Sequence, residues 1–212
     1  DKLEGQGSVT RVHGGAVWSG GVDRSGVRFF TRQLHNGAAK RDIAIKASDL
    51  IRAKKTVIAD SSTTVLEALR ALGDCPDLTV VSNAVGITDR GAEVPFHLIS
   101  TGGLFNHDSM SFQGEPAIRT LERYHVELAV LSCKALDLDR GVMDSYESEA
   151  VVKRVMVRRA DEVAILADHT KFDQVAFLKL MDLEGLSYII TDTKPSDEWV
   201  DRCEELAIAL VY

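Results

Sequence analysis

The sequence has few cysteines and no long apolar run, and each shortage excludes a class of protein. Only three cysteines occur, Cys75, Cys133 and Cys203, far apart in a chain of 212 residues. An odd, widely spaced set is neither a disulfide framework nor a zinc-binding pattern, so we expect a cytoplasmic protein without a bound metal. The longest apolar run, residues 206–212, is too short to span a bilayer. The first residues have no apolar core of a signal peptide, so we expect no membrane partner.

Positive charge is also in short supply. The chain has 25 lysines and arginines against 32 aspartates and glutamates, a formal net charge of −7. Because nucleic-acid backbones are bound through cationic surfaces, these residues alone are not expected to bind DNA. Its hydrophobic content of 45% is ordinary for a folded chain. A chain of this length can bury roughly 70% of its unfolded surface, enough for a core without disulfides or metal.

The first 40 residues differ in composition from the rest. They hold eight of the 16 glycines, and a short strand expected at 8–12 is broken by His13-Gly14-Gly15. We therefore interpret residues 1–40 as a junction and linker and residues 41–212 as one domain. Trp18 and the Phe29-Phe30 pair are predicted to pack either on a neighbouring subunit or on their own domain.

From residue 41 onward, helical and strand patterns alternate. Apolar residues at helical spacing predict helices at about 41–53, 65–72, 115–123 and 148–160, and from about 196. Short apolar runs predict strands at 56–59, 78–81, 96–99, around 112, and at 128–132, 162–167, 187–190 and 207–211. This alternation is typical of an α/β three-layer sandwich with a mostly parallel, Rossmann-like sheet.

Polar residues follow several of the expected strands, where ligands of open parallel sheets bind. Asp60-Ser61-Ser62-Thr63-Thr64 joins a strand to a helix, and its hydroxyls and free N–H groups suit a phosphate. The loop has neither glycine nor lysine, so it is not a nucleotide P-loop. The alternative is that Ser61 or Ser62 is simply an N-cap.

Other strand ends carry further candidates. Asn83, Gly102-Gly103 and Asp168-His169-Thr170-Lys171 together favour a sugar-phosphate pocket, although each alone is more typical of turns or solvated side chains. His169 is a candidate base or metal ligand, with a structural strand-end histidine favoured. Cys133 is more typical of a buried apolar side chain than of a nucleophile.

Three more residues are open to two interpretations. Lys134 and Asp137 either reach the same crevice or lie in an exposed loop. Lys153 lies one turn after Glu149, where a surface ion pair is the simpler explanation.

Taken in order, these segments resemble DeoR-family bacterial repressors. The resemblance rests on Arg11-Val12-His13-Gly14-Gly15-Ala16, the Asp60–Thr64 loop, Thr101-Gly102-Gly103, Glu149-Ala150-Val151-Val152-Lys153 and Ala167-Asp168-His169-Thr170-Lys171-Phe172, and covers about residues 8–212. It implies an effector-sensing domain, similar in fold to sugar-phosphate isomerases and CoA transferases, that binds a phosphorylated sugar. Ser62 stands where glycine is common, and Lys134 where small or acidic residues are common.

The resemblance also implies a set of effector-binding residues and a set of partners. The residues are Asp60, Ser61, Ser62, Thr63, Thr64, Asn83, Gly102, Gly103, Lys134, Asp137, Lys153, Asp168 and Lys171. A DNA-binding winged helix-turn-helix is expected to precede residue 8, so operator DNA is a partner only through that missing domain. We expect a homo-oligomer, a dimer or a tetramer, and no cofactor.

Three hypotheses follow for the function. A sensor domain of a repressor of carbohydrate catabolism is favoured, because no acid–base constellation for isomerisation can be assigned. The alternatives are a sugar-phosphate isomerase-like enzyme, with Asp60, Asp168 or His169 as the base, and a pure oligomerisation module.

Overall fold

The computed structural model describes residues 9–12, 15–18, 29–87 and 94–212. The expected break at His13-Gly14 and the side chain of Trp18 lie outside the described residues. The helices are α1 Phe29–Leu34, α2 Gly37–Arg52, α3 Thr63–Arg70, α4 Gly114–Leu121, α5 Glu147–Arg158 and α6 Asp197–Glu205. Short 3-10 turns lie at η1 His169–Lys171 and η2 Leu183–Gly185.

The strands form one large parallel sheet and three small antiparallel ones. The large sheet has the order β14-β13-β11-β8-β3-β4-β5, and every neighbouring pair is parallel. Its members are β3 Thr56–Ala59, β4 Thr79–Ser82, β5 His97–Ser100, β8 Val126–Ser132, β11 Ala160–Leu166, β13 Tyr188–Ile190 and β14 Ala209–Val211. The small sheets pair β1 Val9–Val12 with β2 Gly15–Trp18, β6 Leu104–Asn106 with β7 Ser111–Gln113, and β10 Gly141–Asp144 with β9 Ala135–Asp137 and β12 Leu178–Met181.

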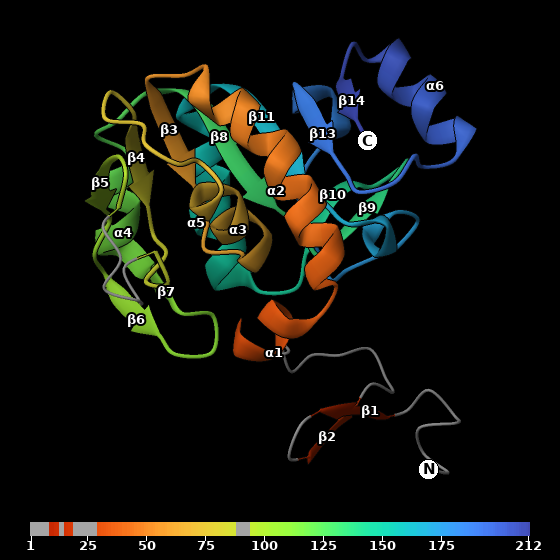
Figure 1. Cartoon of the computed structure of the whole chain (residues 1–212), viewed down its shortest axis with the longest axis horizontal. Coiled ribbons are helices and arrows are strands. Elements are labelled where there is room, and N and C mark those ends of the chain that lie inside the picture. The colour runs from red at the N-terminus through yellow and green to blue at the C-terminus, as the bar shows by residue number, and fades with distance from the viewer. Residues whose placement is uncertain (1–8, 13–14, 19–28, 88–93) are drawn as a thin grey trace.

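Helices cover both faces of the large sheet, which confirms the predicted three-layer α/β sandwich (Figure 1). Successive strand residues alternate between two cores: Val57 belongs to the core that includes side chains of α2 and α3, whereas Ile58 belongs to the core that includes side chains of α5 and α6. Leu128 and Ala129 of β8 divide in the same way. Because both faces are buried, the strands read as continuous apolar runs rather than as alternating ones.

The helix predicted at 41–53 begins earlier in the structure, at Gly37, and is preceded by α1. Phe29 is buried against its own domain, beside Gly86 and Leu66, whereas Phe30 stays half exposed. The segment that the sequence pattern assigns to the linker thus includes a helix that packs on α3 at the lower edge of the sheet in Figure 1.

Candidate functional site

The strand order reverses between the two central strands, and this reversal defines the candidate site. From β3 the chain builds outward through β4 and β5, and from β8 it builds the other way through β11, β13 and β14. Ligands of open α/β sheets bind in the crevice outside the carboxyl ends of the strands at such a switch point. Asp60 follows β3 and Cys133 follows β8, so the predicted phosphate loop starts at this point.

A buried ionic cluster joins the two central strand ends. The ammonium group of Lys153 donates to Ser132 O at 2.8 Å and Asp144 Oδ2 at 2.7 Å, and lies 3.2 Å from Asp60 Oδ2. Asp60 Oδ2 also accepts the Ser132 N–H at 3.0 Å. Burial lowers the pKa of Lys153, but the carboxylates of Asp144 and Asp60 outweigh burial and hold the pKa above its ordinary value. Lys153 is therefore a buried cation that joins three elements, not half of a surface pair with Glu149.

The loop after Asp60 is shaped by that carboxylate. Asp60 Oδ1 accepts the Ser62 N–H at 2.9 Å, and the Ser62 hydroxyl caps α3 by accepting the Val65 N–H at 3.2 Å. The first two helical amides, of Thr63 and Thr64, have no acceptor among the described residues. Ser62 thus has the capping role that was the simpler alternative. The amides and hydroxyls beyond it remain available to an anion at a helix N-terminus.

Three cations from three different elements lie near this edge: Arg32 of α1, Lys40 of α2 and Lys171 of η1. Lys40 of α2 is buried, and its ammonium group donates to two backbone carbonyls, Arg32 O and, at 2.7 Å, His35 O. Burial lowers the pKa of Lys40 to about 8; Asp168 and Glu67 oppose the shift, and Lys171 and Arg32 add to it. Among the described residues Lys40 has no ion pair. Lys40 therefore lies near two other cations, Lys171 and Arg32, as well as near the carboxylates of Asp168 and Glu67.

Arg32 and Lys40 were missed because the composition of residues 1–40 indicates a linker. One signal was available in the sequence: Lys40 lies three, four and seven residues before Ile43, Ala44 and Ala47, and so continues the apolar stripe of α2. Lysine is almost never fully buried unless it is paired, so a lysine on the buried face of a helix indicates a specific interaction.

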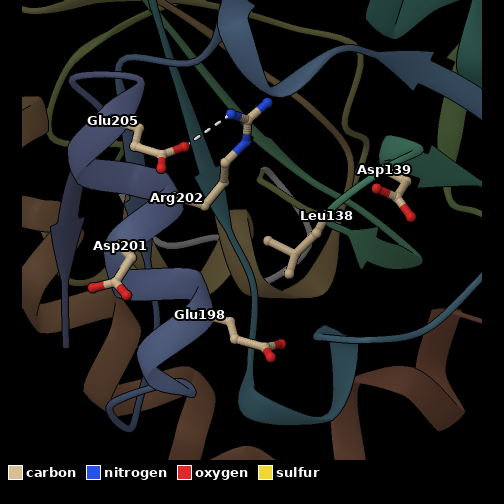
Figure 2. A pocket seen from close by; sticks show the side chains of 6 residues that line it. All are labelled: Leu138, Asp139, Glu198, Asp201, Arg202 and Glu205. Carbon is tan, nitrogen blue, oxygen red and sulfur yellow. Dashed lines mark hydrogen bonds and ion pairs between the residues drawn. The ribbon is translucent and has the colours of Figure 1, made fainter.

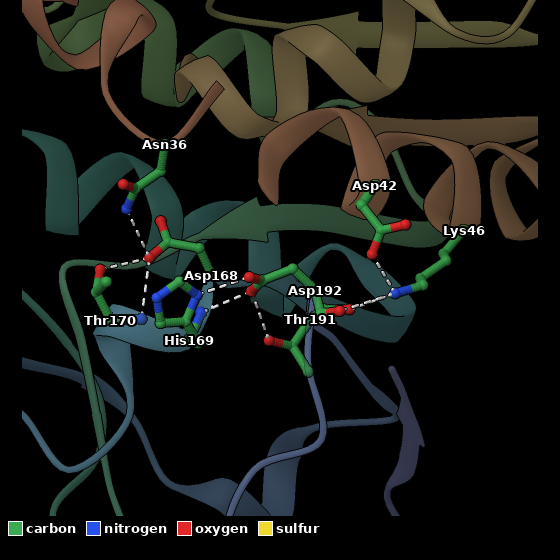
Figure 3. Close-up of polar contacts among 8 residues, drawn as sticks. All are labelled: Asn36, Asp42, Lys46, Asp168, His169, Thr170, Thr191 and Asp192. Carbon is green, nitrogen blue, oxygen red and sulfur yellow. Dashed lines mark hydrogen bonds and ion pairs between the residues drawn. The ribbon is translucent and has the colours of Figure 1, made fainter. Parts of the chain in front are cut away.

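Asp168, at the end of β11, connects this edge to the start of α2. Its Oδ1 accepts hydrogen bonds from Asn36 Nδ2 at 3.2 Å, from Thr170 N at 3.1 Å and from the Thr170 hydroxyl (Figure 3). Lys171 follows within η1, and its charge acts on Lys40 and Cys133. Asp168 and Lys171 therefore lie at the same edge as Lys40.

His169 faces away from these groups and pairs with Asp192, as Figure 3 shows. Its ring Nδ1 lies 2.6 Å from Asp192 Oδ2, and its backbone N–H donates to Oδ1 at 2.7 Å. Burial raises the pKa of Asp192, but the two hydrogen bonds from His169 lower it more. Within the described ranges no three His, Cys, Asp or Glu side chains cluster to hold a metal. Asp192 thus fixes the orientation of the His169 ring at the end of β11.

On the other side of the switch point, the β6–β7 hairpin closes over Asn83 and the diglycine. Asn83 Nδ2 donates to Phe112 O at 3.0 Å, while its buried Oδ1 has no partner among the described residues. Gly103, at φ 122°, would place a Cβ 2.7 Å from Gln113 O. Gly102, at φ 58°, has open space at the same position. Gly103 therefore serves close backbone packing, and Asn83 retains a free acceptor.

Lys134 lies just before the β9–β10 hairpin and Asp137 ends β9, so both lie beyond the end of β8. Lys134 is exposed, and its backbone N–H donates to Met143 O at 3.0 Å. Asp137 accepts the backbone N–H groups of Asp139 and Arg140, at 3.2 and 2.8 Å, and the Arg140 guanidinium at 3.3 Å. The contacts of Asp137 tie it to the hairpin turn, and none of them brings it to Asp60.

Two further titratable groups, the buried thiol of Cys133 and the half-buried carboxyl of Glu149, lie near this edge. Burial raises the pKa of Cys133 to about 12, so its thiol stays protonated at neutral pH and is a poor nucleophile. Burial likewise raises the pKa of Glu149, although Lys153 opposes the shift.

A separate open depression lies between the β9–β10 turn and α6 (Figure 2). It is lined by Leu138, Asp139, Glu198, Asp201, Arg202 and Glu205. Its arginine is paired with Glu205 at 3.1 Å and with Glu184 at 3.2 Å. The remaining carboxylates repel phosphate, so this depression is not suited to an anion.

Relatives of this chain are transcriptional regulators. HTH-type transcriptional regulator YulB of Bacillus subtilis is 35% identical over 91% of this chain and 74% of its own length. The L-fucose operon activator of Haemophilus influenzae is 30% identical over 100% and 84%. HTH-type transcriptional repressor GlcR of Bacillus subtilis is 28% identical over 99% and 81%.

A solved structure of eIF2B delta from Chaetomium thermophilum shares the fold. It aligns with a TM-score of 0.52 and 14% sequence identity, over 78% of this chain and 59% of the other. No helix in the described part of the chain is both long and apolar enough to cross a membrane. Residues 35–193 match the family described as DeoR C terminal sensor domain. The chain therefore belongs to the DeoR C terminal sensor domain family, and the relatives above are named as transcriptional regulators rather than as enzymes.

Proposed function

We propose that the carboxyl edge around β3 and β8 binds the phosphate group of a phosphorylated sugar, and that this binding changes how the full-length regulator binds its operator. The observation that carries the proposal is the N-terminus of α3. Its amides at Thr63 and Thr64 have no acceptor in the part of the chain that the structure describes, and Lys40 and Lys171 lie at the same edge. An anion at this point would accept hydrogen bonds from the two amides and would offset the positive charges of the two lysines.

The sugar part of the effector would meet the hydrogen-bonding groups beside the phosphate loop. Asn83 offers a free acceptor for a hydroxyl group, and Gly102 leaves open space next to it. One relative is named for the L-fucose operon, which agrees with a sugar-derived effector. Of the residues inferred from the resemblance, Asp60 and Lys153 satisfy each other, so we assign them to positioning the loop.

The link to DNA is a shift between two arrangements of the full-length regulator, taken here as a homo-oligomer with a DNA-binding domain in each subunit. A ligand moves such an equilibrium only by its differential affinity for the two arrangements. Operator affinity should therefore change with effector concentration, in a direction that the sensor domain alone does not determine.

Calorimetric titration of this chain with sugar phosphates, inorganic phosphate and the unphosphorylated sugars tests the proposal. We expect sugar phosphates to bind, free sugars to bind at least about tenfold more weakly, and Thr63→Ala and Lys171→Ala each to cost about tenfold in affinity. Thr120→Ala and Lys194→Ala, on the surface away from the edge, are matched controls and should bind like the wild type. Equal binding of free and phosphorylated sugars would refute the phosphate site.

A further inference from the structure

Helix α1 is too short to be stable by itself and is held by a few contacts. It has six residues, whereas isolated helices below about 12–15 residues are marginal in water. Phe29 is its buried side chain, and the Phe29 N–H donates to Asp108 O at 2.8 Å. Phe30 and Leu34 are 50% and 78% exposed. The position of α1 therefore depends on what holds its other end.

The C-terminal end of α1 is held by groups that belong to the candidate site. The Lys40 ammonium group donates to Arg32 O and His35 O, carbonyls that lack partners at the end of a helix. The corner between α1 and α2 is Asn36, in the left-handed region at φ 52°, and its amide donates to Asp168 Oδ1 (Figure 3). Two side chains thus attach the α1–α2 corner to the strand-end edge.

Lys40 is placed to respond to an anion. It is 5% exposed, and within the described ranges its ammonium group donates to two neutral carbonyls and to no other group. Asp168 and Glu67 favour its charged form, while Arg32 and Lys171 oppose it. Burial lowers the pKa of Lys40 to about 8, so Lys40 is partly neutral at a pH near or above about 8. At such a pH an anion beside Lys40 and Lys171 would favour the ammonium form, and hydrogen bonds from a charged donor are stronger than neutral ones. The hold on α1 should therefore tighten.

We propose that Lys40 relays occupancy of the strand-end anion site to α1, so that effector binding fixes α1, and with it the N-terminal side of the chain, against the sensor domain. This inference rests on the proposed function, because it needs an anion at that edge. Of the helices in the described residues, α1 is the first in chain order, so a bound effector that holds α1 can act through it on the residues N-terminal to it.

Amide hydrogen exchange of this chain at a pH of about 8.5, where Lys40 is partly neutral, with and without saturating inorganic phosphate at constant ionic strength, tests the relay. Peptides covering α1 and the His35 amide, which donates to Thr31 O at 3.3 Å, report on the helix. Peptides covering residues 61–66 report separately on the phosphate loop. We expect phosphate to slow exchange in both regions, in α1 by about fivefold, as for one strengthened hydrogen bond.

Variants separate the relay from general stabilisation. Lys40→Gln should bind phosphate more weakly, so phosphate is raised until residues 61–66 are protected. At that concentration α1 should still exchange as quickly as without phosphate. Lys46→Gln is the matched control on the same helix, because Lys46 donates to Thr191 O and Asp192 O, at 3.0 and 3.3 Å, and not to α1. Its α1 should respond as in the wild type.

The outcomes are distinguishable. Protection of residues 61–66 without any change in α1 would overturn the relay and leave the proposed function standing. No protection in either region would overturn both. The wild-type comparison decides this by itself if Lys40→Gln does not fold.

Discussion

Replacing Lys153 by methionine should destabilise the protein strongly, because it removes the cation from a buried cluster and leaves two carboxylates behind. Asp60 and Asp144 are 1% and 5% exposed, and both lie within 3.2 Å of the Lys153 ammonium group. Breaking a buried pair by removing one partner typically costs about 3–5 kcal/mol, because the remaining charge is uncompensated. Here two like charges remain, so we expect a loss of unfolding free energy at the upper end of that range.

Urea unfolding of wild type and Lys153→Met at neutral pH measures this loss. Lys194→Met is the control: Lys194 is an exposed lysine paired with Asp197 at 2.8 Å, and its loss should change stability by less than about 0.5 kcal/mol. A loss below about 1 kcal/mol in Lys153→Met would refute the view that Lys153 compensates the two carboxylates.

The pH dependence of the same variant gives a second check on the reasoning. Without Lys153, the buried carboxylates should have folded-state pKa values above their unfolded values. The folded state then binds protons more readily than the unfolded state, so the deficit should shrink as the pH falls through these raised pKa values. In the triple variant Asp60→Asn, Asp144→Asn, Lys153→Met, much of the loss at neutral pH should be recovered. A deficit that is constant with pH would contradict the electrostatic explanation.

Three further predictions concern the edge and its support. Sulfate keeps its charge above neutral pH, so its affinity should fall, by up to about tenfold per unit, as the pH rises above about 8 and Lys40 loses its proton; calorimetry that finds no change up to pH ~9.5 would contradict this. Gly103→Ala should cost at least about 1–3 kcal/mol in chemical denaturation, because its φ is 122° and a Cβ would meet Gln113 O; an unchanged midpoint would disprove the close approach. Trp199→Phe should cost about 1–3 kcal/mol in thermal unfolding, since it removes a fully buried indole whose N–H donates to Asp173 Oδ1 at 2.8 Å; a variant as stable as the wild type would argue against that bond.

The sequence by itself determined the layers of the fold and the edge that carries the site. Strands buried on both faces must be apolar throughout, so short apolar runs in the sequence predict β3, β8 and β11. The predicted ends of these strands lie within two residues of the observed ends. Parallel strands also bring their carboxyl ends together, so the polar residues that follow them, such as Asp60 and Asp168, could be assigned to one edge. These features depend on local pattern and on sheet geometry alone.

Only the tertiary structure decided which charged groups meet. Lys153 reads locally as a partner of Glu149, yet it is buried against Asp60 and Asp144. The pairing of Asn36 with Asp168 joins residues 132 positions apart, and no local period reports such a contact. For the same reason β9, β10 and β12 were not expected, because each has three or four residues and is defined by its pairing.

The most consequential difference concerns Arg32 and Lys40. Glycine content indicated a linker before residue 41, and composition averages over a window cannot detect a six-residue helix. Helix α1 is held in place because Phe29 packs into the folded domain and because Lys40 of α2 donates to the carbonyls of Arg32 and His35 at the end of α1. The folded domain supplies both the buried site and the lysine. Local patterns thus predicted the strand-end edge at which we propose that an anion binds, whereas long-range packing decided which cations lie at that edge and what they hold in place.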